Sequence, residues 1–183
     1  IYESRENKDN VVILDKNQLA EMKANYDGEI AFIDYYFGDF IEYLSQQKLD
    51  EKTIVIFTSD HGEEFLDHGG YWHGSTLYDE LIKVPLIIYF PDSQSQIYKQ
   101  RISTIDIFPT LIDRLDKDNY DKYDLTGQSL LSLIETGRFE EKPIFSATAF
   151  RCRLKYSLIS YNKKIIKYIN GDIIGLYNLN NDP

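Results

Sequence analysis

Cysteine is nearly absent from this chain, and its scarcity excludes two ways of stabilising a fold. The 183 residues include one cysteine, Cys152, so neither an intrachain disulfide nor a zinc cluster built on cysteines can form. We interpret Cys152 as a structural thiol at the entrance of a strand.

Long apolar runs are also missing. None approaches the roughly 18 residues of a membrane-spanning helix, so the sequence predicts no membrane segment.

Positive charge is the next scarcity, with 20 lysines and arginines against 30 acidic residues and a net charge of -10. Nucleic-acid binding requires basic surfaces that displace counterions, so we expect no nucleic-acid partner. The first ten residues are polar and charged, unlike an export leader. The sequence predicts no localisation, because any export signal or membrane anchor would lie upstream. The apolar content of 43% is that of a globular domain with a core.

Helical and strand patterns alternate in the first three quarters of the chain. Apolar residues recur every three or four positions from 16 to 47, which predicts a long helix. Two apolar, β-branched runs indicate strands buried on both faces, typical of a parallel sheet under helices. Two further helices are expected, one with Ser103 or Thr104 as N-cap and one ending at Gly137. The two strands cover 53–58 and 84–90, and the two helices cover 103–115 and 125–135.

After Pro143 the pattern changes to four short strand candidates. Asn170-Gly171 is a strong two-residue hairpin signal, since both residues accept positive φ. We therefore predict an α/β domain over residues 1–140, followed by a small antiparallel sheet subdomain over residues 141–183. The strand candidates cover 144–148, 154–160, 165–170 and 173–179.

All three histidines lie between residues 61 and 73, in a segment that begins where the first predicted strand ends. Ligands bind outside the carboxyl ends of strands in open α/β sheets. Asp60 and His61 combine an oxygen and an imidazole ligand, and Gly62 allows an irregular backbone that aims both inward. Oxygen ligands suit Ca²⁺, Mg²⁺ or Mn²⁺, and imidazole suits Zn²⁺. We predict that Asp60 and His61 bind a divalent metal, with further ligands from elsewhere.

His73 lies one loop further on and could hydrogen-bond an anionic oxygen of a substrate. The structural alternative is that Asp60 caps a turn and His61 lies on the surface. The position after a strand and the clustering of all the histidines favour the functional interpretation. The other acids of the segment are expected to be solvated, and its two large aromatics are expected to pack. These residues are Glu63, Glu64, Asp67, Tyr71 and Trp72.

These segments together resemble the C-terminal half of a sulfatase, a family of the alkaline phosphatase superfamily of metal-dependent hydrolases. The central match consists of Thr58–Phe65 with His68-Gly69, His73-Gly74, Leu77–Glu80 and Val84–Ile87. Further segments before and after it occur in the family order. They are Tyr26–Ile30 with Asp34 and Gly38, Ser103–Leu111, Leu125–Leu130, and the terminal Leu176–Pro183.

The resemblance implies that a nucleophile activated on a divalent metal, most simply Ca²⁺ with Mn²⁺, Zn²⁺ or Mg²⁺ as alternatives, attacks a sulfate or phosphate ester. Asp60 and His61 match the second pair of metal ligands of the family. His73 matches a catalytic residue that contacts the transferring group or protonates the leaving oxygen, and His68 is a second candidate for substrate binding. The lysine that many relatives carry in this loop is missing, and His73 could replace it.

The family's first ligand pair and its Cys-x-Pro-x-Arg segment, whose cysteine matures to formylglycine, do not occur here. We therefore expect a C-terminal fragment that is inactive alone and needs the missing N-terminal half of the catalytic domain as its partner. A phosphoester hydrolase or a phosphoethanolamine or phosphoglycerol transferase of the same superfamily is the alternative enzyme. A non-catalytic structural or partner-binding module is the alternative outside enzymes.

Overall fold

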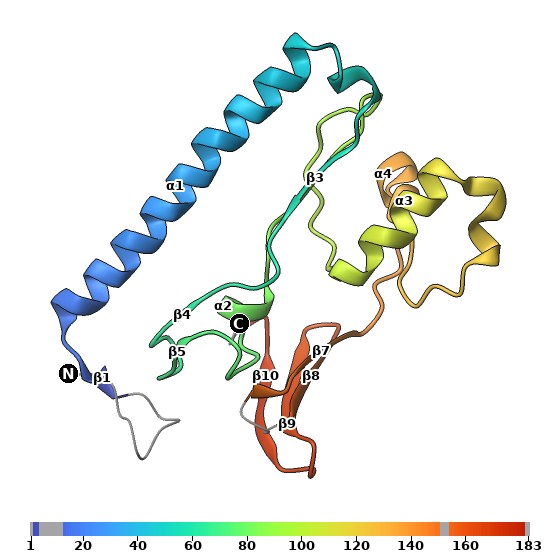
Figure 1. Cartoon of the computed structure of the whole chain (residues 1–183). Coiled ribbons are helices and arrows are strands. Elements are labelled where there is room, and N and C mark those ends of the chain that lie inside the picture. Colours follow the sequence, from blue (N-terminus) through green and yellow to red (C-terminus); the bar gives the residue numbers. More distant parts are fainter. Residues whose placement is uncertain (1, 4–12, 151–153, 182–183) are drawn as a thin grey trace. The chain divides into compact units, whose positions relative to one another are not determined.

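The computed structural model describes residues 2–3, 13–150 and 154–181 (Figure 1). Cys152, interpreted above as a structural thiol, lies outside the described residues, as do most of the first ten residues and the terminal Asp182-Pro183. The chain divides into two compact units, Ile1–Ser95 with Ala147–Lys155, and Gln96–Ser146 with Tyr156–Pro183. Each unit is described by itself below.

The long helix of the first unit, α1, spans Lys16–Gln46 and confirms the helix expected from the apolar periodicity. It begins with a capping box. The Asp15 carboxylate accepts hydrogen bonds from the backbone N–H groups of Asn17 and Gln18, and the Gln18 side chain accepts one from the Asp15 N–H. These bonds satisfy donors that have no partner inside the helix, so the start of α1 is fixed locally.

Two strands follow α1, and they are antiparallel. β3 (Val55–Thr58) pairs with β6 (Leu86–Tyr89), with Ile56 opposite Ile88. The sequence-based expectation of parallel strands buried on both faces is therefore wrong for this pair. The segment between β3 and β6 is long enough for a crossover, but it folds into the short β4–β5 hairpin and α2 and returns the chain antiparallel. Ile87 and Tyr89 of β6 are exposed.

One face of β3 meets α1. The ring centroids of Phe37 on α1 and Phe57 on β3 lie 5.0 Å apart, and those of Tyr26 and Phe65 lie 5.3 Å apart. These aromatic contacts place the C-terminal end of β3 and the loop after it along the helix. The remaining elements of this unit are short: β1 (Tyr2–Glu3) paired antiparallel with β2 (Ile13–Leu14), η1 (Asp50–Lys52), β4 (Glu64–Phe65) paired antiparallel with β5 (Tyr71–Trp72), and α2 (Asp79–Ile82).

The helices of the second unit are held by a buried acid. The Asp106 carboxylate accepts hydrogen bonds from the backbone N–H groups of Ser103 and Gln128, which ties two distant segments together. The helix predicted from Ser103 appears as η2 (Thr104–Asp106) continued by α3 (Ile107–Leu115), and η3 (Lys117–Lys122) follows. The next helix, α4, is limited to Leu131–Thr136, and Gly137 ends it with a φ of 71° as predicted.

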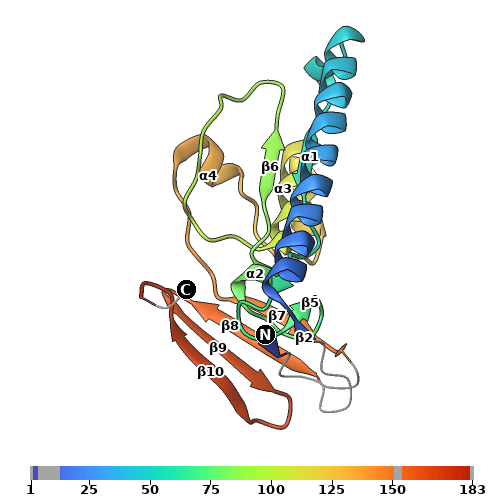
Figure 2. The ribbon, with the colours of Figure 1, turned by 90° about the vertical axis from the view of Figure 1, so that its left-hand side faces the viewer.

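The predicted small sheet is present and consists of consecutive, neighbouring strands (Figure 2). β9 and β10 pair antiparallel, which confirms the predicted hairpin, but its turn is longer than the two residues expected. The Tyr168 N–H donates to the Asp172 carbonyl, and of Asn170 and Gly171 only Gly171 has a positive φ, 100°. Ile159 and Ile166 are buried in the sheet, and so are the polar residues Lys155, Ser157 and Lys164 of the same two strands. The strands are β7 (Ile144–Thr148), β8 (Lys155–Ser160), β9 (Lys163–Tyr168) and β10 (Ile173–Asn178).

With these elements, the fold is of the α/β class with a small antiparallel sheet near its C-terminus, as the sequence predicted. Within the residues that the structure describes, no helix has both the length and the apolar character needed to cross a membrane.

Candidate active site

Asp60 and His61 lie directly after the C-terminal end of β3, and each has one side-chain atom that is available as a ligand. Asp60 Oδ1 accepts the His61 backbone N–H at 3.0 Å, so Oδ2 is the carboxylate oxygen left over. His61 Nδ1 lies 2.8 Å from the Gly62 carbonyl oxygen, which can only accept, so Nδ1 donates and Nε2 is left for a ligand. The two remaining atoms, Asp60 Oδ2 and His61 Nε2, are 3.7 Å apart.

That separation fits one shared cation. Ligand distances for Zn²⁺ and Ca²⁺ are about 2.0–2.6 Å, so two ligand atoms of one ion commonly lie 3–4 Å from each other. Both side chains are accessible, because 86% of the Asp60 side chain and 42% of the His61 side chain is exposed. The donor set of one carboxylate oxygen and one imidazole nitrogen therefore fits a divalent metal and leaves positions for further ligands.

Gly62 is required where the chain turns away from this pair. Its backbone N–H donates to the Leu81 carbonyl at 2.9 Å, and a Cβ at this position would lie 2.0 Å from the Glu80 carbonyl oxygen. No side chain can be accommodated at that distance from backbone, so α2 packs against the turn only because residue 62 is glycine. The close approach fixes the direction in which Asp60 and His61 leave β3.

His73 is brought to His61 by the β4–β5 hairpin. The two imidazole rings stack, with centroids 4.1 Å apart and planes at 27°. His73 Nδ1 lies 3.0 Å from Glu63 Oε2. In the described part of the chain, neither Asp60, His61 nor His73 belongs to a group of three side chains whose ligand atoms lie within 4.8 Å of one another. His73 therefore adjoins the Asp60–His61 pair without completing it as a third ligand.

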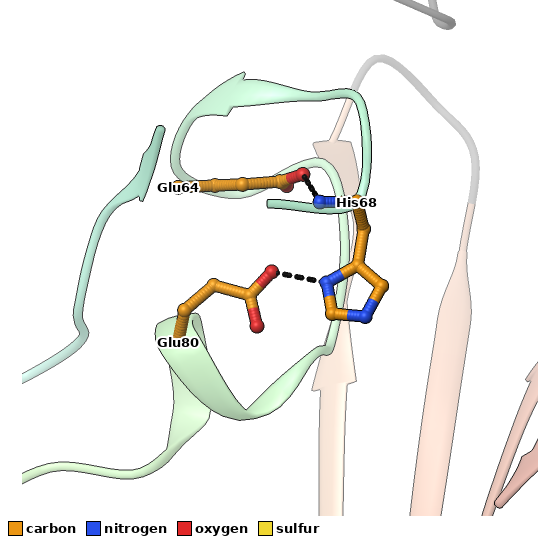
Figure 3. A group of neighbouring side chains, drawn as sticks. All are labelled: Glu64, His68 and Glu80. Carbon is orange, nitrogen blue, oxygen red and sulfur yellow. Dashed lines mark hydrogen bonds and ion pairs between the residues drawn. The ribbon is translucent and has the colours of Figure 1, made fainter. Parts of the chain in front are cut away.

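His68, the other predicted substrate contact, lies in the same hairpin but is engaged by a different set of residues. Its Nδ1 is 2.6 Å from Glu80 Oε1, and its ring stacks on Tyr78 with centroids 3.7 Å apart and planes at 7°. Figure 3 shows the His68 ring turned toward Glu80 of α2. Nε2 is the ring nitrogen that this ion pair leaves over.

Glu64 is the residue that organises the hairpin, and its burial corrects the expectation of a solvated acid. It is completely buried, and its carboxylate accepts hydrogen bonds from the backbone N–H groups of His68 and Gly70 and from the Thr76 hydroxyl. A buried carboxylate is tolerated when such donors replace its water shell. The missing side chain of Gly70 makes room for it, because a Cβ there would lie 2.7 Å from Glu64 Oε2.

Glu64, His68 and Glu80 also form a cluster that could hold a metal by distance alone, since one ligand atom from each lies within 4.8 Å of the others (Figure 3). Both Glu64 oxygens already accept hydrogen bonds from N–H or O–H donors, and His68 Nδ1 is paired with Glu80. We therefore assign this cluster to the framework of the hairpin.

The hairpin contains backbone conformations that are unusual for side-chain-bearing residues. Leu66 and Trp72 have φ values of 68° and 69°, and Gly74, which follows His73, has a φ of 85°. Trp72 is 58% exposed, which contradicts its expected role as a packing residue. Non-glycine residues in this region cost free energy and often occur at functional sites.

The sequence identified the three histidines and Asp60, and the structure brings His61 and His73 together. Sequence reasoning missed the acids that orient the histidines, Glu63 and Glu80, and the buried Glu64. Their position within or just after a histidine-rich segment was the available signal, but their burial and their partners depend on the hairpin.

The chain is similar to known proteins over most of its length. A family model described as Sulfatase matches residues 2–117. The chain is 32% identical to human arylsulfatase K over 181 residues, which are 92% of this chain and 33% of that protein. It is 33% identical over 129 residues to the multifunctional alkaline phosphatase superfamily protein PehA of Trinickia caryophylli, covering 68% of this chain and 24% of that protein.

The fold is also similar to that of the phosphonate monoester hydrolase SpPMH from Silicibacter pomeroyi, with a TM-score of 0.74 and 20% identity, over 91% of this chain and 36% of that one. These findings place the protein in the alkaline phosphatase superfamily, whose members include hydrolases. Within it, the chain belongs to the sulfatase family. It spans only about a quarter to a third of the length of the curated relatives named here.

Proposed function

We propose that this chain is the C-terminal part of the catalytic domain of a metal-dependent sulfatase, which hydrolyses a sulfuric ester. Residues 1–140 would contribute one side of the metal and substrate site, and residues 141–183 the small sheet subdomain. The observation that carries the proposal is the 3.7 Å separation of Asp60 Oδ2 and His61 Nε2 at the C-terminal end of β3.

Asp60 and His61 would hold the divalent cation. We favour Ca²⁺, with Mn²⁺, Zn²⁺ and Mg²⁺ as alternatives, because a carboxylate oxygen suits the hard cations and the imidazole extends the choice toward zinc. When bound, the cation supplies positive charge against the ester oxygens and the nucleophile. The role of this chain is to place these two ligand atoms next to each other on one strand end.

His73 would be the catalytic residue of this half. Its ring lies against His61, so its Nε2 can contact an oxygen of a group bound beside Asp60 and His61. A proton on Nε2 can then be donated to the leaving oxygen or shared with a sulfuryl oxygen, and both neutralise developing charge. His68 is retained as a second substrate contact through Nε2, since Glu80 engages its Nδ1.

The exposed apolar surface supports the proposal that a further region of the catalytic domain packs on this chain. Soluble proteins seldom expose so many large apolar side chains on one element. The exposed members on α1 are Tyr26, Ile30, Phe32, Ile33, Tyr35, Tyr36, Phe40, Ile41 and Tyr43, and on β6 they are Ile87 and Tyr89.

The test compares this chain alone with the complete protein that includes the upstream nucleophile. We expect turnover of 4-nitrophenyl sulfate only by the complete protein, because catalysis requires the attacking group as well as the metal. Turnover by the purified 183-residue chain that is lost in His61→Ala would contradict the fragment interpretation. A complete protein that binds metal but hydrolyses no sulfate ester would contradict the sulfatase assignment.

A phosphoester hydrolase or transferase of the same superfamily is the second candidate, favoured by the similarity to PehA. Its expected result is higher kcat/KM for 4-nitrophenyl phosphate than for the sulfate. A non-catalytic module would bind a partner and turn over neither ester.

A further inference from the structure

Glu63 occupies a position that the proposed site does not yet explain. It directly precedes β4, and its Oε2 lies 3.0 Å from His73 Nδ1. Only 18% of the Glu63 side chain is exposed, against 45% of the His73 side chain. We propose that Glu63 is a positioning residue that holds the His73 ring so that Nε2 faces the substrate. This inference rests on the role proposed above for His73.

The chemistry of the contact determines which ring nitrogen is left for the substrate. An ionised carboxylate can only accept hydrogen bonds, so Nδ1 of His73 must carry the proton in this contact. Nε2 is then the nitrogen that remains available. Residues that orient a functional imidazole through its second nitrogen commonly affect activity by about 10–100-fold.

A second contact restrains the same ring from its face. His61 stacks on His73 at a centroid distance of 4.1 Å. A hydrogen bond at Nδ1 and a stacked neighbour together restrict both the direction and the tilt of the imidazole. Because His61 is the proposed metal ligand, the same stack also fixes the distance between His73 and the metal pair.

The second oxygen of Glu63 argues that the side chain is not there for stability alone. Glu63 Oε1 is buried, and no group among the described residues donates a hydrogen bond to it. Leaving a buried carboxylate oxygen unpaired costs free energy. By contrast, the neighbouring Glu64 has donors for both of its oxygens. A buried carboxylate oxygen without a donor therefore requires an explanation other than framework packing, and a role in positioning His73 supplies one.

The close spacing of Asp60, His61 and Glu63 along the chain explains how one short segment can both provide the proposed metal-ligand atoms and orient His73. Asp60 and His61 supply the metal-ligand atoms, Gly62 turns the chain against α2, and Glu63 then points at His73. A single tight turn therefore sets the relative positions of the metal pair and of the orienting carboxylate.

The experiment is a double-mutant cycle in the complete protein, with kcat and KM measured on 4-nitrophenyl sulfate and 4-nitrophenyl phosphate for Glu63→Met, His73→Ala and the double variant. Glu63→Met keeps the size of the side chain and removes the acceptor. We expect it to lower kcat by about 10–100-fold with little change in KM, and to have no further effect in the His73→Ala background.

Glu63→Gln retains an amide oxygen acceptor and should recover a large part of the loss. Asp67→Asn, an equal loss of charge at an exposed position of the same hairpin, is the matched control.

Losses that multiply in the double variant would overturn the proposal, because Glu63 would then act independently of His73. Equal losses in Glu63→Met and Glu63→Gln would also overturn it. A second measurement does not depend on turnover. The hydrogen-bonded Nδ1–H proton of His73 should be visible by NMR in the wild type, retained in Glu63→Gln and absent from Glu63→Met. If it persists in Glu63→Met, the positioning contact is wrong. If it behaves as expected in a protein without esterase activity, the proposed function fails and the positioning contact stands.

Discussion

The histidine loop, residues 59–76, and the C-terminal sheet, β7–β10, are both built from short strands, but they are stabilised in different ways. The sheet relies on backbone hydrogen bonds between strands and on buried side chains such as Ile159 and Ile166. The loop has strands of only two residues, and a single buried carboxylate, Glu64, binds its backbone from within. The loop therefore depends on a few specific polar contacts, whereas the sheet depends on many interchangeable ones.

Both regions contain unfavourable local structure, and the difference lies in where it occurs. In the loop, Leu66 and Trp72 at positive φ and the unpaired Glu63 Oε1 lie within the segment that carries the histidines. In the sheet, Tyr161 at positive φ lies in the turn between β8 and β9, and Ser157 Oγ of β8 is buried with no partner among the described residues. Strain and unpaired polar atoms are expected at sites that act on ligands, because such sites are selected for geometry rather than for stability. The comparison predicts that changes in the loop affect activity and that changes in the sheet affect stability.

The largest effect is expected from removing a proposed metal ligand. Asp60→Ala or His61→Ala in the complete protein should lower kcat/KM by roughly 10³-fold or more, because the cation neutralises developing charge. Calorimetric titration with Ca²⁺, Mn²⁺ and Zn²⁺ should show weaker binding in the same variants. For the 183-residue chain alone we expect dissociation constants no tighter than roughly micromolar, since the pair fills only part of a coordination sphere. A nanomolar site abolished by Asp60→Ala would mean that this chain holds a complete ligand set.

His73→Ala should separate catalysis from metal binding. We expect kcat to fall by roughly 10²–10⁴-fold while metal affinity stays nearly unchanged. Across a series of esters, the loss should shrink for good leaving groups such as 4-nitrophenolate if His73 protonates the leaving oxygen. The loss should be uniform if His73 only contacts the sulfuryl or phosphoryl oxygens. Unchanged rates on every ester would remove His73 from the site.

Gly62→Ala tests whether the geometry of the loop depends on the close approach to α2. The new Cβ would lie 2.0 Å from the Glu80 carbonyl oxygen, so the turn after Asp60 and His61 must move. A displacement of about 1 Å near the reacting groups can lower turnover by about 10²-fold. Gly28→Ala on α1, where a Cβ would meet nothing within 4 Å, is the matched control. Equal activity of the two variants would show that the turn is not critical.

Substitutions in the C-terminal sheet should change the free energy of unfolding and leave the activity of the folded protein unchanged. Ile166→Ala removes a buried side chain and should lower the free energy of unfolding by about 2–5 kcal/mol. Leu176→Ala, at a position that is 71% exposed, should change it by less than about 0.5 kcal/mol. Chemical denaturation of the complete protein measures both. A selective loss of kcat in a folded Ile166→Ala protein would break the distinction between the two regions.

Local sequence signals predicted most of the elements. The apolar periodicity from residue 16 predicted α1, Gly137 predicted the end of α4, and Asn170-Gly171 predicted the β9–β10 hairpin. Each of these signals acts over a few residues, so it can be read from the chain without knowing the fold. The direction of β6 against β3 could not be read in this way, because strand direction depends on the whole connection between them.

For the candidate site, the sequence by itself determined which residue types are available: one carboxylate and one imidazole after a strand, and every histidine within one short segment. Only the tertiary structure decided which of them meet. The stacking of His73 on His61, the pairing of Glu63 with His73 and the burial of Glu64 all require the hairpin to fold back over residues up to twelve positions apart. Such contacts arise from chain reversal and from the steric fit of Gly62 against α2, and neither has a periodicity that a sequence pattern can reveal.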